Sequence, residues 1–190
     1  MTQVSFERKI QAALKDGGIA IDVVFVPYRG IKRKRVWLLF GRPNSAPINA
    51  IDFPQGELPL VRWTGGCLKK ACQTAFSTRF EQVLPTNAFS EPLMTHEHVN
   101  YRNQHKLLVY IAVAVPNDIV LKSVTSENMF CEPLWHEATN GELPQILSAG
   151  MRDEGKYRAH LNAIRQLMSR GHEWVVNHTP QPEVEAAQAA

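Results

Sequence analysis

The chain has 190 residues, enough for one domain with a hydrophobic core and too few for two domains of ordinary size. Hydrophobic residues make up 44% and charged residues 21%, which is typical of a globular protein and excludes disorder over the whole chain. The formal net charge of +3 is divided unevenly, because residues 1–82 hold 13 Lys and Arg against 6 Asp and Glu, and residues 83–190 hold 8 against 12. This asymmetry predicts one face that attracts anions.

The sequence predicts a cytoplasmic protein without a membrane-spanning segment. The longest strongly apolar run, residues 107–115, is less than half of the roughly 20 residues that a spanning helix needs. Charged residues interrupt the first 16 positions, which therefore lack the apolar stretch of an export signal. Cys67, Cys72 and Cys131 form no Cys-x-x-Cys pair, so we expect buried thiols rather than a disulfide framework or a zinc site.

The first third of the chain is predicted to hold a short helix and a set of strands. Apolar residues recur at helical spacing over residues 4–15, and Asp16-Gly17-Gly18 ends that pattern. β-branched and aromatic residues then predict strands over residues 19–26, 36–40 and 48–53. The first two form a hairpin with a long basic connection, and an irregular stretch follows the third over residues 54–66.

The clearest periodicity predicts a central helix over residues 67–83, ended by Pro85. We expect it to bury Leu68, Cys72, Phe76, Phe80 and Val83 and to expose Lys69, Lys70, Gln73 and Ser77. Further strands are expected over residues 89–99, 106–115 and 133–136, then helices over residues 143–147 and 153–174. Residues 179–190 are predicted to be a disordered tail, which leaves a single domain over residues 1–178.

Three local motifs, in this order, resemble the Nudix fold. Asp52-Phe53-Pro54-Gln55-Gly56 stands where that family commonly has Phe-Pro-Gly-Gly, and the helix from Cys67 takes the place of its catalytic helix. Glu132-Pro133-Leu134-Trp135, with Leu143-Pro144 behind it, resembles the family's late strand and the helix that follows. The resemblance implies an α/β (α+β) fold, namely an α/β/α sandwich with a mixed sheet.

The carboxylates of the Nudix signature are missing from this helix. In the family these carboxylates hold Mg²⁺, which neutralises a pyrophosphate and activates water. Counting from Gly56 without a gap places Arg62, Ala71, Thr74 and Ala75 at the four glutamate positions. Shifting the helix positions by three residues places Thr74, Ser77 and Thr78 at the last three. Because neither register supplies a carboxylate, we expect no standard Nudix hydrolysis, no bound cofactor and no catalytic residue in this helix.

Basic and aromatic residues form the candidate ligand site. Arginine and lysine neutralise phosphates, and an aromatic side chain can stack on a base. The candidates are Arg29, Lys32, Arg33, Lys34, Arg35, Arg42, Arg62, Trp63, Lys69 and Lys70. A simpler interpretation is a solvated turn whose charges protect the edge of a strand.

Two other side-chain groups suggest different chemistry. His96 and His98 share one side of a predicted strand, and with His105 they are candidates for a metal site, although no third ligand is fixed by the spacing. The simpler interpretation is polar residues at a strand end. A nucleophilic Cys67 or Cys72 is a further hypothesis, but Cys72 lies on the apolar stripe, where a thiol is inert.

Three functions are therefore consistent with the sequence. The first is a catalytically inactive Nudix-like protein that binds a nucleotide or single-stranded nucleic acid. The second is a protein-interaction module with an acidic protein partner, such as an inhibitor or an assembly subunit of a mobile-element or defence-related system. The third is an atypical phosphohydrolase that recruits Glu57, Glu91 or Glu132 from outside the helix. The carboxylate-free helix disfavours the third and does not separate the first two.

Overall fold

The computed structural model describes residues 8, 12, 20–31, 35–42, 51–58, 67–99, 105–122, 131–138, 142–150 and 153–170. The two described residues of the predicted N-terminal helix, Arg8 and Ala12, are helical. The rest of that helix and the predicted tail over residues 179–190 lie outside the described residues. No helix within the described ranges is long and apolar enough to cross a membrane.

A mixed sheet forms the centre of the molecule. Its strands are β1 (Ala20–Ile31), β2 (Arg35–Arg42), β3 (Gln55–Glu57), β4 (Met94–Val99), β5 (His105–Ala114) and β6 (Cys131–Glu137). They lie in the order β4-β5-β1-β2-β6, with β3 paired to β1. The only parallel pair among them is β1 with β5. These two strands have nearly continuous apolar sequences because helices cover both of their faces.

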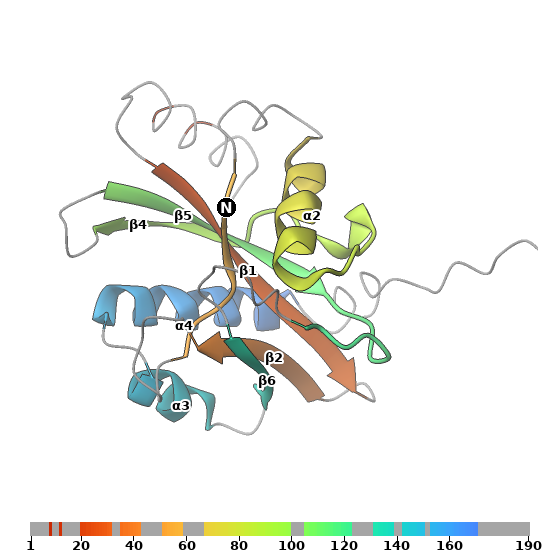
Figure 1. Cartoon of the computed structure of the whole chain (residues 1–190). Coiled ribbons are helices and arrows are strands. Elements are labelled where there is room, and N and C mark those ends of the chain that lie inside the picture. The colour runs from red at the N-terminus through yellow and green to blue at the C-terminus, as the bar shows by residue number, and fades with distance from the viewer. Residues whose placement is uncertain are drawn as a thin grey trace, which may run out of the picture.

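Helices cover both faces of the sheet (Figure 1). Helix α2 (Cys67–Phe80) lies on one face, and α3 (Leu143–Gly150) and α4 (Glu154–Ser169) lie on the other. A short 3-10 helix, η2 (Thr86–Ala88), precedes β4. Side chains alternate along each strand, so Phe25 faces α2 whereas Val24 and Val26 face α4. The result is the sandwich with a mixed sheet that we expected.

The central helix ends three residues earlier than predicted. It stops at Phe80 because Glu81 takes a left-handed backbone conformation with φ of 50°, which ends an α-helix. The chain then turns so that Leu84 is buried and Val83 is 71% exposed, which makes the predicted burial of Val83 wrong. Gln73 is not a free surface residue either, since its Nε2 donates to the Leu84 carbonyl oxygen at 2.5 Å and holds this turn.

Other boundaries differ where local propensity is weak. The stretch expected to be irregular contains β3, which pairs with β1 although Gln55-Gly56-Glu57 has little intrinsic strand preference. The predicted strand over residues 89–99 is reduced to β4, preceded by an isolated bridge at Phe89. Only residues 51–53 of the strand predicted over 48–53 are described, and there Asp52 forms an isolated bridge with Gly41. Helix α4 begins after Asp153, which caps it by accepting from the Lys156 backbone N–H at 2.9 Å.

We predict that Phe76→Ala lowers the free energy of unfolding by about 3–5 kcal/mol, because a fully buried aromatic ring is lost. Phe76 has ring contacts to Phe25, Phe80 and Phe89, so the cavity cannot close easily. Urea unfolding measures the change, with the exposed Lys70→Ala on the same helix as control and expected to shift it by less than about 0.5 kcal/mol. Equal effects of the two variants would contradict this packing.

Candidate functional site

The structure describes five of the ten predicted ligand-binding residues. These are Arg29, Arg35, Arg42, Lys69 and Lys70. The other five lie outside the described residues, namely Lys32, Arg33, Lys34, Arg62 and Trp63.

Arg29, Trp37 and Trp135 lie on the α2 side of the sheet, and these three side chains are hereafter the aromatic platform. Arg29 at the end of β1 pairs with Trp37 on β2, and Trp37 pairs with Glu137 on the edge strand β6. The guanidinium carbon of Arg29 lies 4.1 Å from the centre of the Trp135 ring, within the range of a cation–π contact. Strand alternation and the contact of Trp135 with the α2-side core place these side chains on that face.

The aromatic platform carries two N–H donors without an acceptor. Arg29 Nε and Trp37 Nε1 are buried from solvent and have no hydrogen-bond partner in the structure. Leaving a buried donor unpaired costs about 1–3 kcal/mol, so most proteins avoid it. Burial also lowers the pKa of Arg29 from its usual value, although the guanidinium stays charged at neutral pH. Together the three side chains offer an aromatic face, a cation and donors that an acceptor-rich ligand can satisfy.

Arg35 and Glu137 border the platform. Arg35 Nε lies 3.6 Å from Glu137 Oε1, with side chains that are 66% and 19% exposed respectively. Glu137 therefore adds an acceptor beside the two donors, on the same face of the sheet.

Helix α2 presents lysines and hydroxyls on its outer side and contains no Asp or Glu. Lys69 Nζ pairs with Glu91 Oε1 at 3.1 Å, and Lys70 is exposed. The hydroxyls of α2 bond to carbonyls of the same helix: Thr74 to Lys70, and Ser77 and Thr78 to Thr74. Neutral hydroxyls and ammonium groups do not supply the anionic oxygens that Mg²⁺ requires.

Of the carboxylates named as possible replacements, Glu57 does not face α2. Gly56 faces α2, lying against Phe25 and Ala75, so the neighbouring Glu57 points to the opposite face of the sheet. Glu91 is paired with Lys69, and the side chain of Glu132 lies outside the described residues. The described residues include no group of three or more His, Cys, Asp or Glu that could hold a metal ion.

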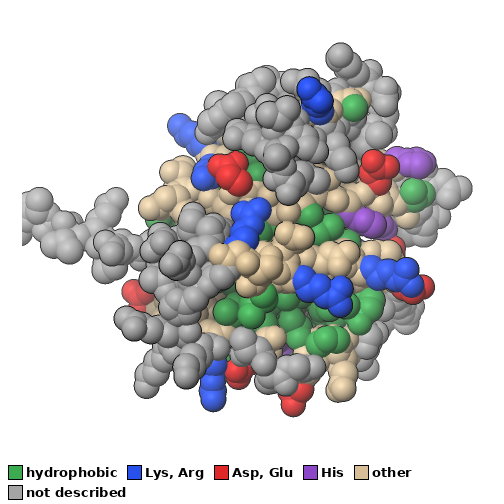
Figure 2. All heavy atoms as spheres, turned by 180° about the vertical axis from the view of Figure 1, so that it is seen from behind, with side chains coloured by type: hydrophobic (Ala, Val, Ile, Leu, Met, Phe, Trp, Pro, Cys, Tyr) green, Lys and Arg blue, Asp and Glu red, His purple; other side chains and the backbone are tan. Residues whose placement is uncertain are grey.

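The described basic residues do not form one continuous surface. Arg42 stands at the opposite end of β2 from Arg35, seven residues away, or about 23 Å at the usual rise of a strand. Figure 2 shows one face of the molecule, on which the described Lys and Arg side chains are separated by other side chains. Arg29 and Arg35 are brought together by the β1–β2 hairpin, whereas Arg42 is not part of that group.

The three histidines proposed as metal ligands do not converge. His96 and His98 lie on the α4 side of β4 with ring centroids 6.4 Å apart, and His98 Nδ1 is 3.6 Å from Asp153 Oδ2. His105 pairs with Val99 across β4 and β5, which puts it on the opposite face of the sheet. The three candidate histidines therefore do not form one group, because alternation along the strands separates His105 from the other two.

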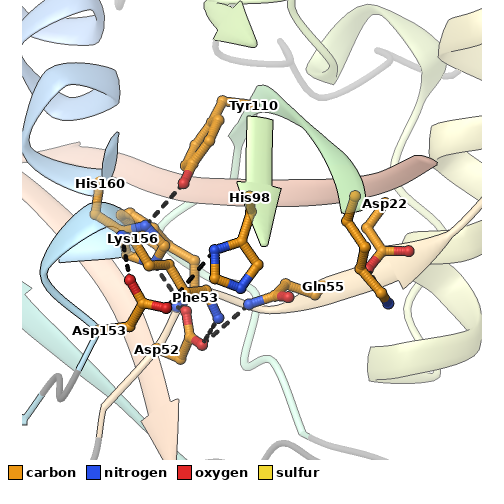
Figure 3. A network of polar contacts seen from close by, with 10 residues as sticks. Asp22, Asp52, Phe53, Gln55, His98, Tyr110, Asp153, Lys156 and His160 are labelled. Carbon is orange, nitrogen blue, oxygen red and sulfur yellow. Dashed lines mark hydrogen bonds and ion pairs between the residues drawn. The ribbon is translucent and has the colours of Figure 1, made fainter. Parts of the chain in front are cut away.

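A buried polar network that the sequence analysis missed joins the segment before β3 to α4 (Figure 3). Asp52 is 8% exposed, and its Oδ1 accepts from His160 Nε2 at 2.7 Å and from the Phe53 backbone N–H at 2.8 Å. Its Oδ2 accepts from Gln55 Nε2 at 3.0 Å and pairs with Lys156 Nζ. On the other side of the imidazole, Tyr110 Oη lies 3.0 Å from His160 Nδ1.

These contacts define the charge state of the network. His160 is fully buried, and burial lowers its pKa, so the neutral ring donates from Nε2 to Asp52 and accepts at Nδ1 from the Tyr110 hydroxyl. Burial alone would raise the pKa of Asp52, but Lys156 and the His160 hydrogen bond outweigh it and lower that pKa to about 2. With one carboxylate, one ammonium and a neutral imidazole, the network is neutral overall. Its signal in the sequence is His160 on the otherwise apolar stripe of α4, with Ala163, Ile164 and Leu167.

Cys72 is a buried, unreactive thiol. Burial, with a smaller contribution from the negative charge of Glu91, raises its pKa to about 12, so no thiolate forms near neutral pH. Of the two cysteines considered as nucleophiles, only Cys72 has a described side chain, and it belongs to the core.

The solved structures that this chain resembles include a MutT/nudix family protein and a NUDIX domain. No family model matches the sequence, and neither does any curated protein. Among solved structures, a MutT/nudix family protein from Enterococcus faecalis is similar with a TM-score of 0.61 and 10% identity, over 94% of this chain and 80% of that one. The NUDIX domain of Shewanella oneidensis NrtR complexed with ADP ribose has a TM-score of 0.54 and 14% identity, over 90% and 99%. The T. brucei MERS1–RNA complex has a TM-score of 0.56 and 12% identity, over 90% and 70%. The fold of this chain is therefore Nudix-like.

The buried network predicts that the protein loses stability in acid. The folded pKa values of His160 and Asp52 both lie below their unfolded values, so the unfolded chain takes up protons first as the pH falls. His160 causes a loss of stability as the pH falls below about 6.5, at up to roughly 1.4 kcal/mol per pH unit. Asp52 causes a further loss between about pH 4 and pH 2.

Urea unfolding at pH 7 and pH 5 tests the histidine contribution in the wild type and in His160→Gln. Burial also lowers the pKa of His96 and His136, so the relevant quantity is the difference between the two proteins. We expect the variant to be less stable at pH 7 and to lose less stability between pH 7 and 5. An identical pH 7–5 loss in both proteins would show that His160 does not exclude its proton in the folded state.

Proposed function

We propose that this protein binds a nucleotide or single-stranded nucleic acid on the α2 side of its sheet and does not hydrolyse it by the Nudix metal mechanism. The observation that carries the proposal is the aromatic platform, where Arg29 covers Trp135 and two buried N–H donors lack acceptors. An anion with a planar group supplies what this surface lacks, namely acceptor atoms and a second aromatic face.

The platform combines the two contributions typical of single-strand binding. Stacking of a base on an aromatic side chain is worth about 1–3 kcal/mol, and arginine adds both charge and a planar stacking group. The described basic residue beside it, Arg35, extends the cationic character of this end of the hairpin. Lys70 adds an exposed positive charge on the same side of the sheet.

The composition of α2, on the same face of the sheet, supports the proposed lack of metal-dependent hydrolysis. Metal-dependent hydrolysis needs several anionic oxygens fixed around the cation, and α2 supplies none. Within the described residues, the acid that pairs with a side chain of α2 is Glu91, which already neutralises Lys69. Because Glu57 points to the α4 side, bringing it to a metal site beside α2 would need a different strand register.

Two proteins with this fold support the class of ligand. The NrtR domain is complexed with ADP ribose and MERS1 is complexed with RNA, so a Nudix-like fold accommodates both a nucleotide-containing small molecule and a nucleic acid. At 10–14% identity the likeness does not extend to individual contacts. The choice of ligand therefore depends on the side chains of this chain itself.

We predict no Mg²⁺- or Mn²⁺-dependent cleavage of ADP ribose, nucleoside triphosphates or dinucleotide polyphosphates, because the helix lacks metal-binding carboxylates. Phosphate or nucleotide release, followed by chromatography with each metal, measures this. Metal-dependent turnover that disappears in Glu57→Gln or Glu132→Gln, but persists in the matched control Glu154→Gln, would establish the phosphohydrolase instead.

We predict that a fluorescein-labelled single-stranded RNA of about ten nucleotides binds in low salt and is released as salt rises. The slope of log K against log salt is about −0.7 for each phosphate contacted on a single strand. Arg29→Ala should weaken binding several-fold, and Arg158→Ala, the same charge change on the exposed outer side of α4, should not. Fluorescence anisotropy measures both, with melting temperatures to exclude unfolding.

The alternative function, a protein-interaction module, makes the opposite prediction in this experiment. An acidic protein partner is attracted by the same positive charges, but its binding does not depend on a base that stacks on the aromatic platform. Failure of the RNA and of free nucleotides to bind at low salt would reject the proposed function and favour the protein partner.

A further inference from the structure

Helices α3 and α4 leave a group of apolar side chains at the surface on the α4 side of the sheet. The two helices lie side by side, because Leu143 and Leu147 of α3 share a core with α4 and the Tyr157 hydroxyl donates to the Pro144 carbonyl oxygen at 3.4 Å. Seen from behind, hydrophobic side chains gather in one area of the surface, with Lys and Arg side chains along its border (Figure 2). The larger apolar residues of the two helices that stay partly or fully exposed are hereafter the α3–α4 patch: Pro144, Ile146, Tyr157, Leu161 and Met168.

The spacing along α4 shows that its apolar residues form two stripes. Ala159 and Ala163 belong to the stripe that is buried against the sheet. Tyr157, Leu161 and Met168 follow one another at intervals of four and seven residues, which places them together on one flank of the helix. This second stripe is only partly covered by the core of the chain, and Met168 is 38% exposed. It therefore offers apolar surface to a partner.

Opposite charges stand at the two ends of the exposed side of α4. Glu154 and Arg165 are eleven residues apart, which is close to three full turns, so their side chains leave the helix in the same direction about 16 Å apart. The Glu154 side chain is 75% exposed, and its Oε1 accepts from Arg158. Arg165 is exposed, and in the described part of the chain its guanidinium contacts the Asn162 side chain at 3.4 Å and no carboxylate. Leu161 lies between the two charges along the helix.

We infer that the α3–α4 patch is a contact surface between two copies of this chain, with the two α4 helices packed antiparallel about a twofold axis near Leu161. In a twofold contact the same surface serves both copies, so each end of one helix meets the other end of its partner. Glu154 of each copy then lies beside Arg165 of the other, and the apolar stripes meet between these two ion pairs. This contact uses the α4 side of the sheet and is independent of the binding function proposed for the α2 side.

The charges beside the patch favour a second copy over an unlike, acidic partner. An acidic partner is attracted by Arg165 but repelled by Glu154 on the same line of the helix. A second copy presents the opposite charge at both ends, and a formal net charge of +3 is too small to keep two copies apart. Arg158 lies close to the axis, where the Glu154 carboxylate of its own chain neutralises it.

Sedimentation equilibrium of the full chain tests whether the contact forms. The surface is limited to the 16 residues of α4 and the exposed side of α3, so we expect a weak dimer with a dissociation constant on the order of 10 μM. Between about 1 and 200 μM protein, the mass should rise from the 21.4 kDa of one chain toward twice that value. A chain that keeps the monomer mass at the highest concentration overturns the inference.

Leu161→Asp tests the apolar centre of the contact. Two carboxylates would meet near the axis, so this variant should keep the monomer mass over the whole concentration range. Val83→Asp is the matched control, because it places the same charge on an apolar residue that is 71% exposed beyond the end of α2, and it should associate like the wild type. Melting temperatures establish that both variants are folded. A folded Leu161→Asp variant that associates like the wild type overturns the contact.

Charge reversal tests the antiparallel register with exposed side chains, so the result does not depend on a change in the core. Glu154→Arg and Arg165→Glu each create two pairs of like charges across the contact, and each should raise the dissociation constant at least about threefold. The double variant restores opposite charges with their positions exchanged and should return to within about twofold of the wild type. Single variants that associate like the wild type, or a double variant no tighter than the singles, overturn the contact.

The labelled RNA separates this inference from the proposed function. Leu161→Asp should bind the RNA with the wild-type affinity, because the aromatic platform lies on the other face of the sheet. A wild type that dimerises without binding RNA or nucleotides rejects the proposed function and leaves the contact standing. A wild type that binds RNA as a monomer at about 200 μM rejects the contact and leaves the proposed function standing.

Discussion

Asp52 is the residue on which the arrangement of this molecule depends most. A carboxylate with 8% exposure is tolerated only when its charge and its lone pairs are matched, and Asp52 is matched from two directions. His160 and Lys156 come from α4, and Phe53 N–H and Gln55 come from its own segment. Removing one partner of such a group typically costs 3–5 kcal/mol, because it leaves a buried charge without compensation. The segment before β3 and the closing helix are therefore held together as one unit.

That unit also sets the position of α2, although α2 lies on the other face of the sheet. Gln55, which donates a hydrogen bond to Asp52, is the first residue of β3. Strand β3 pairs with the first half of β1, at residues 22–24. The next residue, Gly56, faces the helix, and a Cβ built there would be 3.5 Å from the Cβ of Ala75. The backbone of β3 at Gly56 therefore packs directly against the side chain of Ala75 on α2.

Apolar runs and helical periodicity in the sequence were sufficient to predict the helix and sheet layers of the fold. Contacts between residues far apart in the chain could not be predicted in this way. The apolar runs of β1 and β5 and the periodicity of α2 and α4 each lie within one stretch of chain, so their burial could be read from the sequence. The bond between His160 and Asp52 joins residues 108 positions apart, and nothing in either neighbourhood identifies the partner. The end of α2 at Phe80 depends on the backbone of Glu81, a residue with no special preference for that conformation. The candidate ligand residues show the same limit. The sequence predicted the hairpin that brings Arg29 and Arg35 together. The stacking of Arg29 on Trp135 could not be predicted, because it depends on where β6 joins the sheet.

The Asp52 network and the aromatic platform differ in how completely their polar groups are paired. On the α4 face, the buried imidazole of His160 uses both nitrogens, and each oxygen of Asp52 accepts from two donors. On the α2 face, Arg29 and Trp37 keep adjacent buried donors without acceptors, on a platform that already contains a cation. Unpaired donors weaken the folded state, and an external acceptor removes that cost only when it is bound. The polar groups that hold α4 to the segment before β3 are thus paired within the chain, whereas the two donors of the platform are not, and the proposed binding function rests on that contrast.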